Sequence, residues 1–387
     1  MVGFRIDPSA LSAARERAAQ RAAAGEGREL FARLTRGEAL DDESLAALFL
    51  AAEVDTEGLL RLARNQRGGA GIETFSPLYI SNECDAECAM CGMRRTNNEL
   101  RRETADADTV ERQLELLYAR GLRGVAILSG EYRPGPLRRS MLERTGAALR
   151  AALERGFVHV LINVGSLDAE EYRSLLTDVP RSDDGRVVPQ VTMCTFQETY
   201  HPRTYSRFMG ANPDNPRSNF ERRLDNFDRA AEAGMWAVNP GVLLGLHKEP
   251  AYELLALLAH VRHLRARGMR VYVSLPRLRK ASGAAHQAGV SDDELARLVC
   301  LVSAGAPEAK LVISTRERPE IQRRLLPVIS VLTPGSPGVA PYTEDGARFD
   351  IEASQFEVLD HRPIEVILGE YLAAGTPIDC YEPAARG

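Results

Sequence analysis

Short apolar runs alternate with amphipathic segments along the chain from residue 74 onward. An apolar run bounded by turn residues is typical of a buried strand, and the segments between the runs have the spacing of helices that bury one face. The predicted strands cover residues 75–81, 125–129, 157–163, 191–196, 237–246, 271–275, 311–315 and 328–333. The clearest predicted helices cover residues 108–119, 139–155, 220–233, 252–267 and 291–304.

Regular alternation of eight strands with helices predicts an α/β fold, a (β/α)8 barrel of the TIM type. A partial barrel of six strands is the alternative. Nearly every predicted strand ends in a polar or glycine-containing cluster. This favours the eight-stranded barrel, because the active site of such a barrel lies at the carboxyl ends of its strands. We therefore expect the functional site at that face.

The first part of the chain carries helix signals. Residues 7–65 are predicted to be helical, with Asp7 as an N-cap before Pro8. We predict an N-terminal helical extension, residues 1–70, that forms a layer over one end of the barrel. Residues 71–387 then form the barrel and a closing C-terminal helical segment, since 387 residues are enough for one large barrel.

Charge and hydropathy exclude some partners. The net charge is -5 and the Lys and Arg residues form no block, so nucleic acid is not expected as a partner. No long uncharged apolar run and no basic segment followed by an apolar one occurs, so no membrane span, no membrane partner and a cytoplasmic location are predicted. In the cytoplasm, Cys194, Cys300 and Cys380 are expected to be reduced and unpaired.

Three cysteines, Cys84, Cys88 and Cys91, follow the first predicted strand with the spacing Cys-x3-Cys-x2-Cys. Thiolates this close together in a loop bind a soft metal or an iron–sulfur cluster. A closed tetrahedral site needs four ligands, so three thiolates leave one position open for another molecule. The alternatives are a structural zinc site without an evident fourth ligand, or three unrelated buried cysteines.

This spacing after a first strand resembles the radical S-adenosylmethionine (SAM) superfamily. The resemblance implies a [4Fe-4S] cluster whose open iron binds SAM, and a 5′-deoxyadenosyl radical formed with electrons from a donor such as flavodoxin or ferredoxin. Met90 departs from the superfamily pattern, which commonly has an aromatic residue before the last cysteine. A methionine can still pack against adenine.

Two further strand ends resemble SAM-binding elements. The run after the second strand resembles the Gly-Gly-Glu element that binds the SAM amino group, and Gln-Glu-Thr-Tyr after the fourth resembles the tyrosine lyases of the superfamily. By this likeness Glu198 would accept ribose hydroxyls and Arg207 would pair with the SAM carboxylate. The candidate SAM-binding residues are Ser129, Gly130, Glu131, Gln197, Glu198 and Arg207.

Arg316, at the end of the seventh strand, lies in a Ser-Thr-Arg-Glu run that again resembles aromatic amino acid lyases. A planar guanidinium binds a carboxylate through two parallel hydrogen bonds, so Arg316 is the candidate for binding the α-carboxylate of an amino acid substrate. The alternative is an ion pair at the barrel rim with Glu317 or Glu131.

The end of the eighth strand, residues 332–342, resembles the tryptophan lyases that form 3-methyl-2-indolic acid in thiopeptide biosynthesis, and the likeness runs from about residue 70 to 380. It implies a lyase that cleaves and rearranges L-tryptophan, with Tyr79 and Thr333 lining the substrate pocket beside Arg316. The alternative is a tyrosine lyase of the thiamin pathway, which forms dehydroglycine. A hydrogenase maturase of the tyrosine-cleaving type is disfavoured, because Cys380 alone cannot hold the second cluster of such an enzyme.

Overall fold

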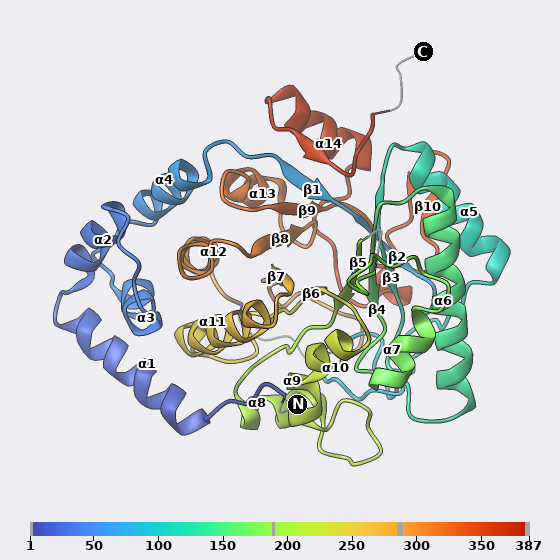
Figure 1. Ribbon diagram of the computed structural model, residues 1–387, viewed down its shortest axis with the longest axis horizontal. Helices are drawn as coiled ribbons and strands as arrows, with labels where there is room; N and C mark the ends of the chain where they lie inside the picture. The colour runs from blue at the N-terminus through green and yellow to red at the C-terminus, as the bar shows by residue number, and fades with distance from the viewer. Residues whose placement is uncertain (1–2, 188–189, 285–288, 384–387) are drawn as a thin grey trace.

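Ten parallel strands form the central sheet of the computed structural model, which describes residues 3–187, 190–284 and 289–383 (Figure 1). A separate antiparallel pair consists of β10 (Tyr342–Thr343) and β11 (Gly346–Ala347). The strands of the central sheet are β1 (Ile72–Thr74), β2 (Ser76–Tyr79), β3 (Gly124–Leu128), β4 (His159–Asn163), β5 (Gln190–Cys194), β6 (Ala237–Asn239), β7 (Arg270–Ser274), β8 (Lys310–Ser314), β9 (Val331–Thr333) and β12 (Ile378–Asp379).

One bent strand brings the two ends of the sheet together. Only Phe75 separates β1 from β2. The second half of this strand, β2, pairs with β3, whereas its first half, β1, pairs with β9. The sheet therefore curls into a barrel of eight strand positions, which confirms the predicted fold and not the six-stranded alternative. Strand β12, which the sequence did not predict, adds to the outside of β1.

Most predicted boundaries shift by a few residues, and two elements differ more clearly from the prediction. The regular part of β6 ends at Asn239, and beyond it the chain makes isolated bridges such as Leu244 to Arg277. The single helix predicted over 220–233 is broken at Asp225, which accepts a hydrogen bond from Arg5 (2.9 Å). The helices outside the barrel are α5 (Ala107–Ala119), α6 (Pro136–Arg155), α7 (Ala169–Leu175), α8 (Pro202–Met209), α9 (Phe220–Leu224), α10 (Asn226–Glu232), α11 (Pro250–Ala266), α12 (Asp292–Gly305), α13 (Pro319–Leu325) and α14 (Ile364–Ala373).

The N-terminal helices lie outside α11 and α12 (Figure 1), and not over an end of the barrel as predicted. Asp7 caps the first of them, accepting from the backbone N of Ser9 (2.9 Å). The buried Arg297 of α12 attaches the layer, because it donates to backbone carbonyls at the end of α3, including that of Phe49 (3.1 Å). These helices are α1 (Pro8–Ala23), α2 (Gly27–Thr35), α3 (Asp42–Leu50) and α4 (Thr56–Arg67).

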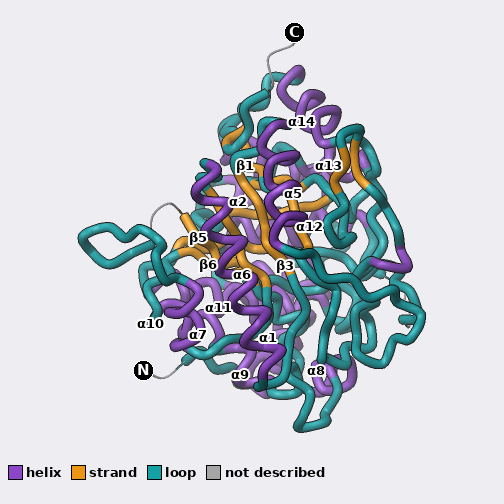
Figure 2. Tube along the Cα trace, turned by 90° about the vertical axis from the view of Figure 1, so that its right-hand side faces the viewer, coloured by secondary structure: helices purple, strands orange, loops and turns teal. Residues whose placement is uncertain are grey.

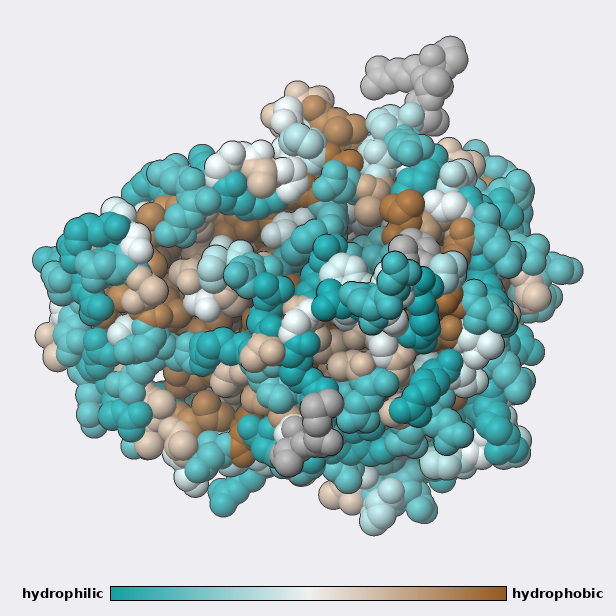
Figure 3. Space-filling view, in the orientation of Figure 1, coloured by the Kyte–Doolittle hydropathy of each residue, from teal (hydrophilic) through white to brown (hydrophobic). Residues whose placement is uncertain are grey.

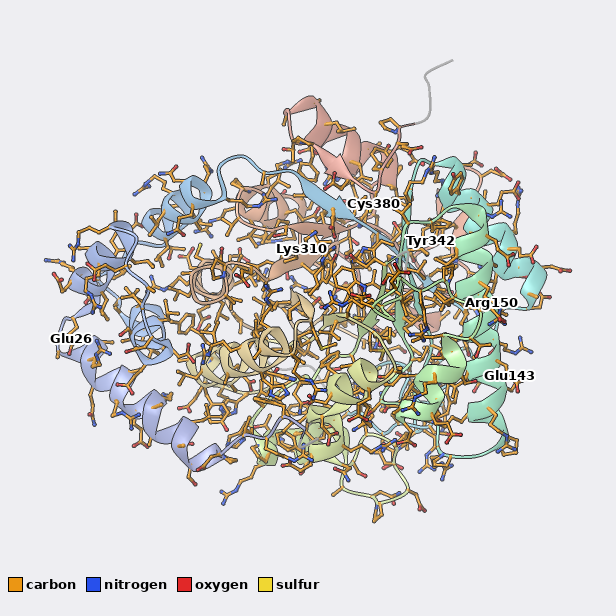
Figure 4. All side chains as sticks on the ribbon, in the orientation of Figure 1. Glu26, Glu143, Arg150, Lys310, Tyr342 and Cys380 are labelled. Atoms are coloured by element: carbon orange, nitrogen blue, oxygen red, sulfur yellow. The ribbon has the colours of Figure 1, made fainter. Side chains whose placement is uncertain are left out.

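A polar network fills the barrel at the amino-terminal ends of the strands. Tyr272 donates to Glu73 (2.8 Å) and accepts from Gln190 (2.6 Å), and Lys310, labelled in Figure 4, pairs with Glu73. Burial lowers the pKa of the neighbouring His159 to about 4, so the imidazole is neutral at pH 7. These side chains satisfy one another, and the cavity described below lies at the opposite end of the barrel.

The outer surface is mostly hydrophilic in the view of Figure 3, with apolar side chains visible on α14, where Val366 is 51% exposed. Glu143 and Arg150 point outward from α6 (Figure 4). Within the described ranges, every helix is too short or too polar to cross a lipid bilayer.

Candidate active site

One cavity at the carboxyl ends of the barrel strands brings most of the predicted site residues together. Its floor is apolar and includes Phe75, Leu161, Cys194 and Val312. Cys194, for which the sequence predicted no functional role, therefore lines the cavity. The predicted site residues that line the cavity are Tyr79, Cys84, Cys88, Cys91, Ser129, Gly130, Glu131, Glu198, Arg316 and Thr333.

The cysteine loop, residues 84–91, is held by close backbone contacts with two other segments, the turn after β3 and α8. Asp85 donates its N–H to the carbonyl of Glu131 (2.9 Å), and Ala89 donates to the carbonyl of Phe208 (2.7 Å). Gly130 fits tightly against the loop, since a Cβ atom there would lie 2.0 Å from the carbonyl oxygen of Glu83. Glycine is required at this close approach.

The donor set of the loop fits an iron–sulfur cluster. Burial raises the pKa of Cys84 to about 11 and that of Cys88 to about 12, so the thiolates need positive charge close by, which cluster iron supplies. Among the residues that the structure describes, no three His, Cys, Asp or Glu side chains converge as ligands of a single metal ion. A [4Fe-4S] cluster needs no such convergence, because each thiolate binds a different iron.

Two carboxylates and two arginines form a buried group beside the cysteine loop. Glu131 accepts from Arg223 (2.9 Å) and from the backbone N of Ser166 (2.9 Å). Arg217 donates to Glu198 (2.8 Å), and its Nε lies 3.6 Å from Glu131. A carboxylate has about four acceptor positions, so both glutamates can also accept hydrogen bonds from a ligand.

Two predicted site residues lie outside the cavity. Gln197 is buried away from it, and its side-chain N–H donates to the carbonyl of Thr199 (3.5 Å). Arg207 is exposed on α8, with its guanidinium over the ring of Phe208 (5.4 Å to the centroid). The arginine beside Cys88 and Glu198 is Arg217, whose pKa is raised above its ordinary value: desolvation opposes the charge, but the Cys88 thiolate and the two glutamates stabilise it more.

The sequence could have shown that Arg207 is exposed, but it could not have identified Arg217. In α8 the buried residues are Tyr205, Phe208 and Met209, and this helical spacing puts Arg207 on the opposite, exposed face. The helical spacing of the apolar residues therefore predicts that Arg207 is exposed. Arg217 lies in an irregular loop without periodicity, so sequence pattern alone could not identify it.

The guanidinium of Arg316 lines the cavity and has no ion-pair partner among the described residues. Its guanidinium lies over the ring of Phe356, 3.2 Å from the centroid, and within the described residues its side chain makes no hydrogen bond or ion pair. Burial lowers its pKa to about 10, which leaves it protonated at pH 7. Glu317 pairs with Arg279 (2.6 Å), and Glu131 pairs with Arg223, so the rim ion pair considered for Arg316 does not form.

A C-terminal strap, residues 352–358, lines the cavity with Gln355, Phe356 and Val358. Its Glu357 donates to the carbonyl of Lys280 (2.8 Å), while the carbonyl of Gln355 accepts from Gly92 (2.9 Å). The side chain of Gln355 accepts from the hydroxyl of Tyr79 (2.6 Å). Phe356, which holds Arg316, belongs to the same strap, so one segment connects the cysteine loop with the substrate-side residues.

The fold and the three-cysteine loop indicate an enzyme that uses a [4Fe-4S] cluster and SAM, and the chain is similar to radical SAM lyases that act on aromatic amino acids. No family model matches the chain. It is 29% identical to the 2-iminoacetate synthase of Escherichia coli over 344 residues, which cover 86% of this chain and 85% of the relative. It is 28% identical to the same enzyme of Salmonella typhimurium over 348 residues, or 87% and 85% of the two chains.

Solved structures agree with this class. A structure of HydG, a maturase of the [FeFe]-hydrogenase, superimposes with a TM-score of 0.80 and 27% identity over 96% of this chain and 79% of that one. The barrel also matches HydG from Carboxydothermus hydrogenoformans (TM-score 0.81, 23% identity, 98% and 87% coverage) and methylornithine synthase (0.67, 17%, 92% and 97%). These last two similarities concern the fold alone.

Proposed function

We propose that the protein is a radical SAM lyase that cleaves the Cα–Cβ bond of L-tyrosine and forms 2-iminoacetate. One observation carries this proposal: the unpaired guanidinium of Arg316 lies in the same cavity as the three cysteines, above an apolar floor. An amino acid has the matching parts, a carboxylate for the guanidinium and an apolar side chain for the floor. The 2-iminoacetate synthases support the choice of reaction.

The bound cofactors would supply a 5′-deoxyadenosyl radical, and the chain supplies the placement. Cys84, Cys88 and Cys91 are positioned to hold the cluster. The backbone of residues 129–131 and the carboxylate of Glu198 would hold SAM, with Arg217 pairing with its carboxylate in place of Arg207. These assignments rest on the residues that line the cavity.

On the substrate side, Arg316 would bind the α-carboxylate and thereby fix the amino nitrogen and the scissile bond relative to SAM. Tyr79 and Thr333 also line the cavity, and the hydroxyl of Tyr79 donates to Gln355 of the strap (2.6 Å). The strap keeps water away from the reacting atoms, which protects radical chemistry from unwanted hydrogen donors.

Tryptophan cleavage to 3-methyl-2-indolic acid is the second candidate function. The segment that resembles tryptophan lyases begins at the end of β9, and four of its residues, Thr333, Gly335, Ser336 and Pro337, line the cavity. The segment can therefore contact a substrate side chain. The relatives reported above favour tyrosine, so tryptophan takes second place.

Anaerobic incubation of the iron-loaded protein with SAM, dithionite and each aromatic amino acid tests both candidates. Formation of 5′-deoxyadenosine with 4-methylphenol and glyoxylate, the hydrolysis product of 2-iminoacetate, supports the tyrosine lyase. A product with the mass of 3-methyl-2-indolic acid, formed from tryptophan, supports the second candidate. Absence of any amino acid product despite SAM cleavage rejects both.

A further inference from the structure

Helix α8 (Pro202–Met209) covers the outer side of the cysteine loop. Its buried residues Tyr205, Phe208 and Met209 pack in one apolar cluster with Cys88 and Met90. The backbone hydrogen bond from Ala89 to Phe208 ties the loop to the helix. A helix with its side chains is about 10 Å across, so the outer face of α8 lies about one helix diameter from the loop. Figures 1 and 2 place α8 in the lower part of the molecule.

The exposed face of α8 is basic. Arg203 and Arg207 are exposed and make no ion pair with any described residue, and the helix contains no acidic residue. Lys248, also exposed, follows His247, whose Nδ1 lies 3.1 Å from the hydroxyl of Thr204 in α8. We call Arg203, Arg207 and Lys248 the α8 patch. The whole chain carries a net charge of -5, so this cluster of positive charge is a local feature.

Two acidic residues near the α8 patch have partners of their own. Glu249, which follows Lys248, pairs with Arg15 (2.6 Å). Glu87 in the cysteine loop pairs with Arg95 and also accepts from Asn212, just beyond the end of α8 (3.4 Å). These acids are therefore neutralised locally, and the positive charge of the patch is available to a partner.

We propose that the α8 patch is the docking site of an acidic one-electron carrier protein, of the flavodoxin or ferredoxin kind, that reduces the cluster. This inference rests on the proposed function. In that function SAM and the amino acid fill the cavity on the inner side of the cysteine loop, so the electron arrives from the outer side. One electron leaves the reduced carrier and enters the cluster, and no atom or proton is transferred.

Complementary charge would act mainly on the rate of association. Opposite potentials on two proteins raise the association rate by about 10-fold to 1,000-fold at low salt, and the gain falls as ionic strength rises. A small chemical reductant such as dithionite needs no docking site. The two kinds of reductant therefore separate docking from chemistry.

The test is the double variant R203E/R207E, assayed anaerobically as iron-loaded protein for formation of 5′-deoxyadenosine. With reduced flavodoxin at low salt and limiting concentration, we expect its rate to fall by about 10-fold or more relative to the unaltered protein. With dithionite, the two rates should be equal. Added salt should lower the flavodoxin-driven rate of the unaltered protein toward that of the variant.

The matched control is R28E/R64E, which makes the same change in net charge on α2 and α4, away from α8 in Figure 1. Arg28 and Arg64 are exposed and make no ion pair with a described residue. The control should form 5′-deoxyadenosine at the rate of the unaltered protein, both with flavodoxin and with dithionite. A normal flavodoxin-driven rate in R203E/R207E overturns the docking site, and so does an equal loss with both reductants. Failure of the unaltered protein to cleave SAM with dithionite overturns the proposed function and the docking site with it.

Discussion

The guanidinium of Arg316 is held in place by an aromatic ring and by no acid among the described residues. A buried cation without an anionic partner is costly, because desolvation disfavours its charged form. Here that cost is visible as the lowered pKa of about 10. A ligand carboxylate would remove the cost, so the site is built for an anionic group that the protein itself does not provide.

Replacing Arg316 by Leu should therefore weaken amino acid binding by about 2 to 5 kcal/mol, or about 30-fold to several thousand-fold. The thermal stability of the substrate-free protein should not fall, since an unpaired buried charge is removed. The assay compares 5′-deoxyadenosine with cleaved amino acid in one reaction. We expect cofactor cleavage to persist while product is lost.

If the Arg316→Leu protein kept its full product yield, the carboxylate would bind elsewhere. Arg279 would then be the next candidate, because it lines the same cavity and shares Glu317 with Arg277. Arg316→Lys is the informative companion variant. It keeps the charge but not the two parallel donors, so it should recover only part of the binding.

The four cysteines of the cavity should differ sharply in their effect on iron binding. Cys88→Ala leaves two loop thiolates, too few to retain the cluster, and the iron content per chain should collapse. Cys194→Ala removes an equally buried thiol from the cavity floor, and iron content should not change. Iron analysis with visible absorption spectra measures both. Loss of iron in the Cys194 variant would show that the cluster is held differently.

Among single residues, sequence pattern predicts position where local spacing determines it. The cysteine loop and Arg316 line one cavity because each follows the end of a barrel strand, β2 or β8. No comparable pattern marks Arg217 or Arg223, which reach the site from an irregular segment and a helix outside the barrel. Long-range placement of this kind depends on the packing of the whole fold.

At the scale of elements, the turn after β3 supports the cysteine loop directly. A Cβ on Gly130 would lie 2.0 Å from the carbonyl oxygen of Glu83 and 2.6 Å from the Cβ of Cys84. Gly130→Ala should thus displace the loop and reduce iron content and SAM cleavage together, at a stability cost of about 1 to 3 kcal/mol. The overall helix content in far-UV circular dichroism should be unchanged.

Gly369→Ala is the matched control for that substitution. Gly369 lies within α14, and a Cβ there meets no atom within 4 Å. Alanine in a helix interior is favoured over glycine by about 0.8 to 1 kcal/mol, so this variant should be slightly stabilised and keep its iron. Equal iron content in both variants would mean that the loop tolerates movement of the β3 turn.

Strand positions were predictable because a strand buried on both faces gives a continuous apolar run. All eight predicted runs correspond to strands of the barrel. The division of the first strand at Phe75 and the addition of β12 depend on hydrogen bonds between residues far apart in the chain, such as Ile72 to Pro377 (2.9 Å). Local sequence carries no record of such pairing.

At the scale of the whole molecule, buried ionisable groups make the stability depend on pH. Burial lowers the pKa of His159 and His247 to about 4 and that of His260 to about 3, against an ordinary 6.5. Between pH 6.5 and about 4 the unfolded chain therefore binds protons that the folded chain does not. The free energy of unfolding should fall as the pH falls through this window.

Glu253 acts in the opposite direction. Burial raises its pKa to about 7 from 4.5, so between these values the folded chain holds a proton that the unfolded chain releases, and stability is lost as the pH rises. Because three histidines oppose one glutamate, we expect net loss of stability on acidification from pH 6.5 to 4.5. Denaturant unfolding of the iron-free protein across this range measures the slope.

Substitution of Glu253 provides the sharpest check on this balance. Glu253 accepts hydrogen bonds from the hydroxyl of Thr199 and the backbone N of Tyr200 (2.8 Å), and a glutamine can occupy the same space with an oxygen still available as an acceptor. Glu253→Gln removes the opposing titration, so the dependence of stability on pH between 4.5 and 7 should become steeper. An unchanged slope would show that Glu253 is not protonated in the folded protein, and a shallower one would reverse the assigned direction.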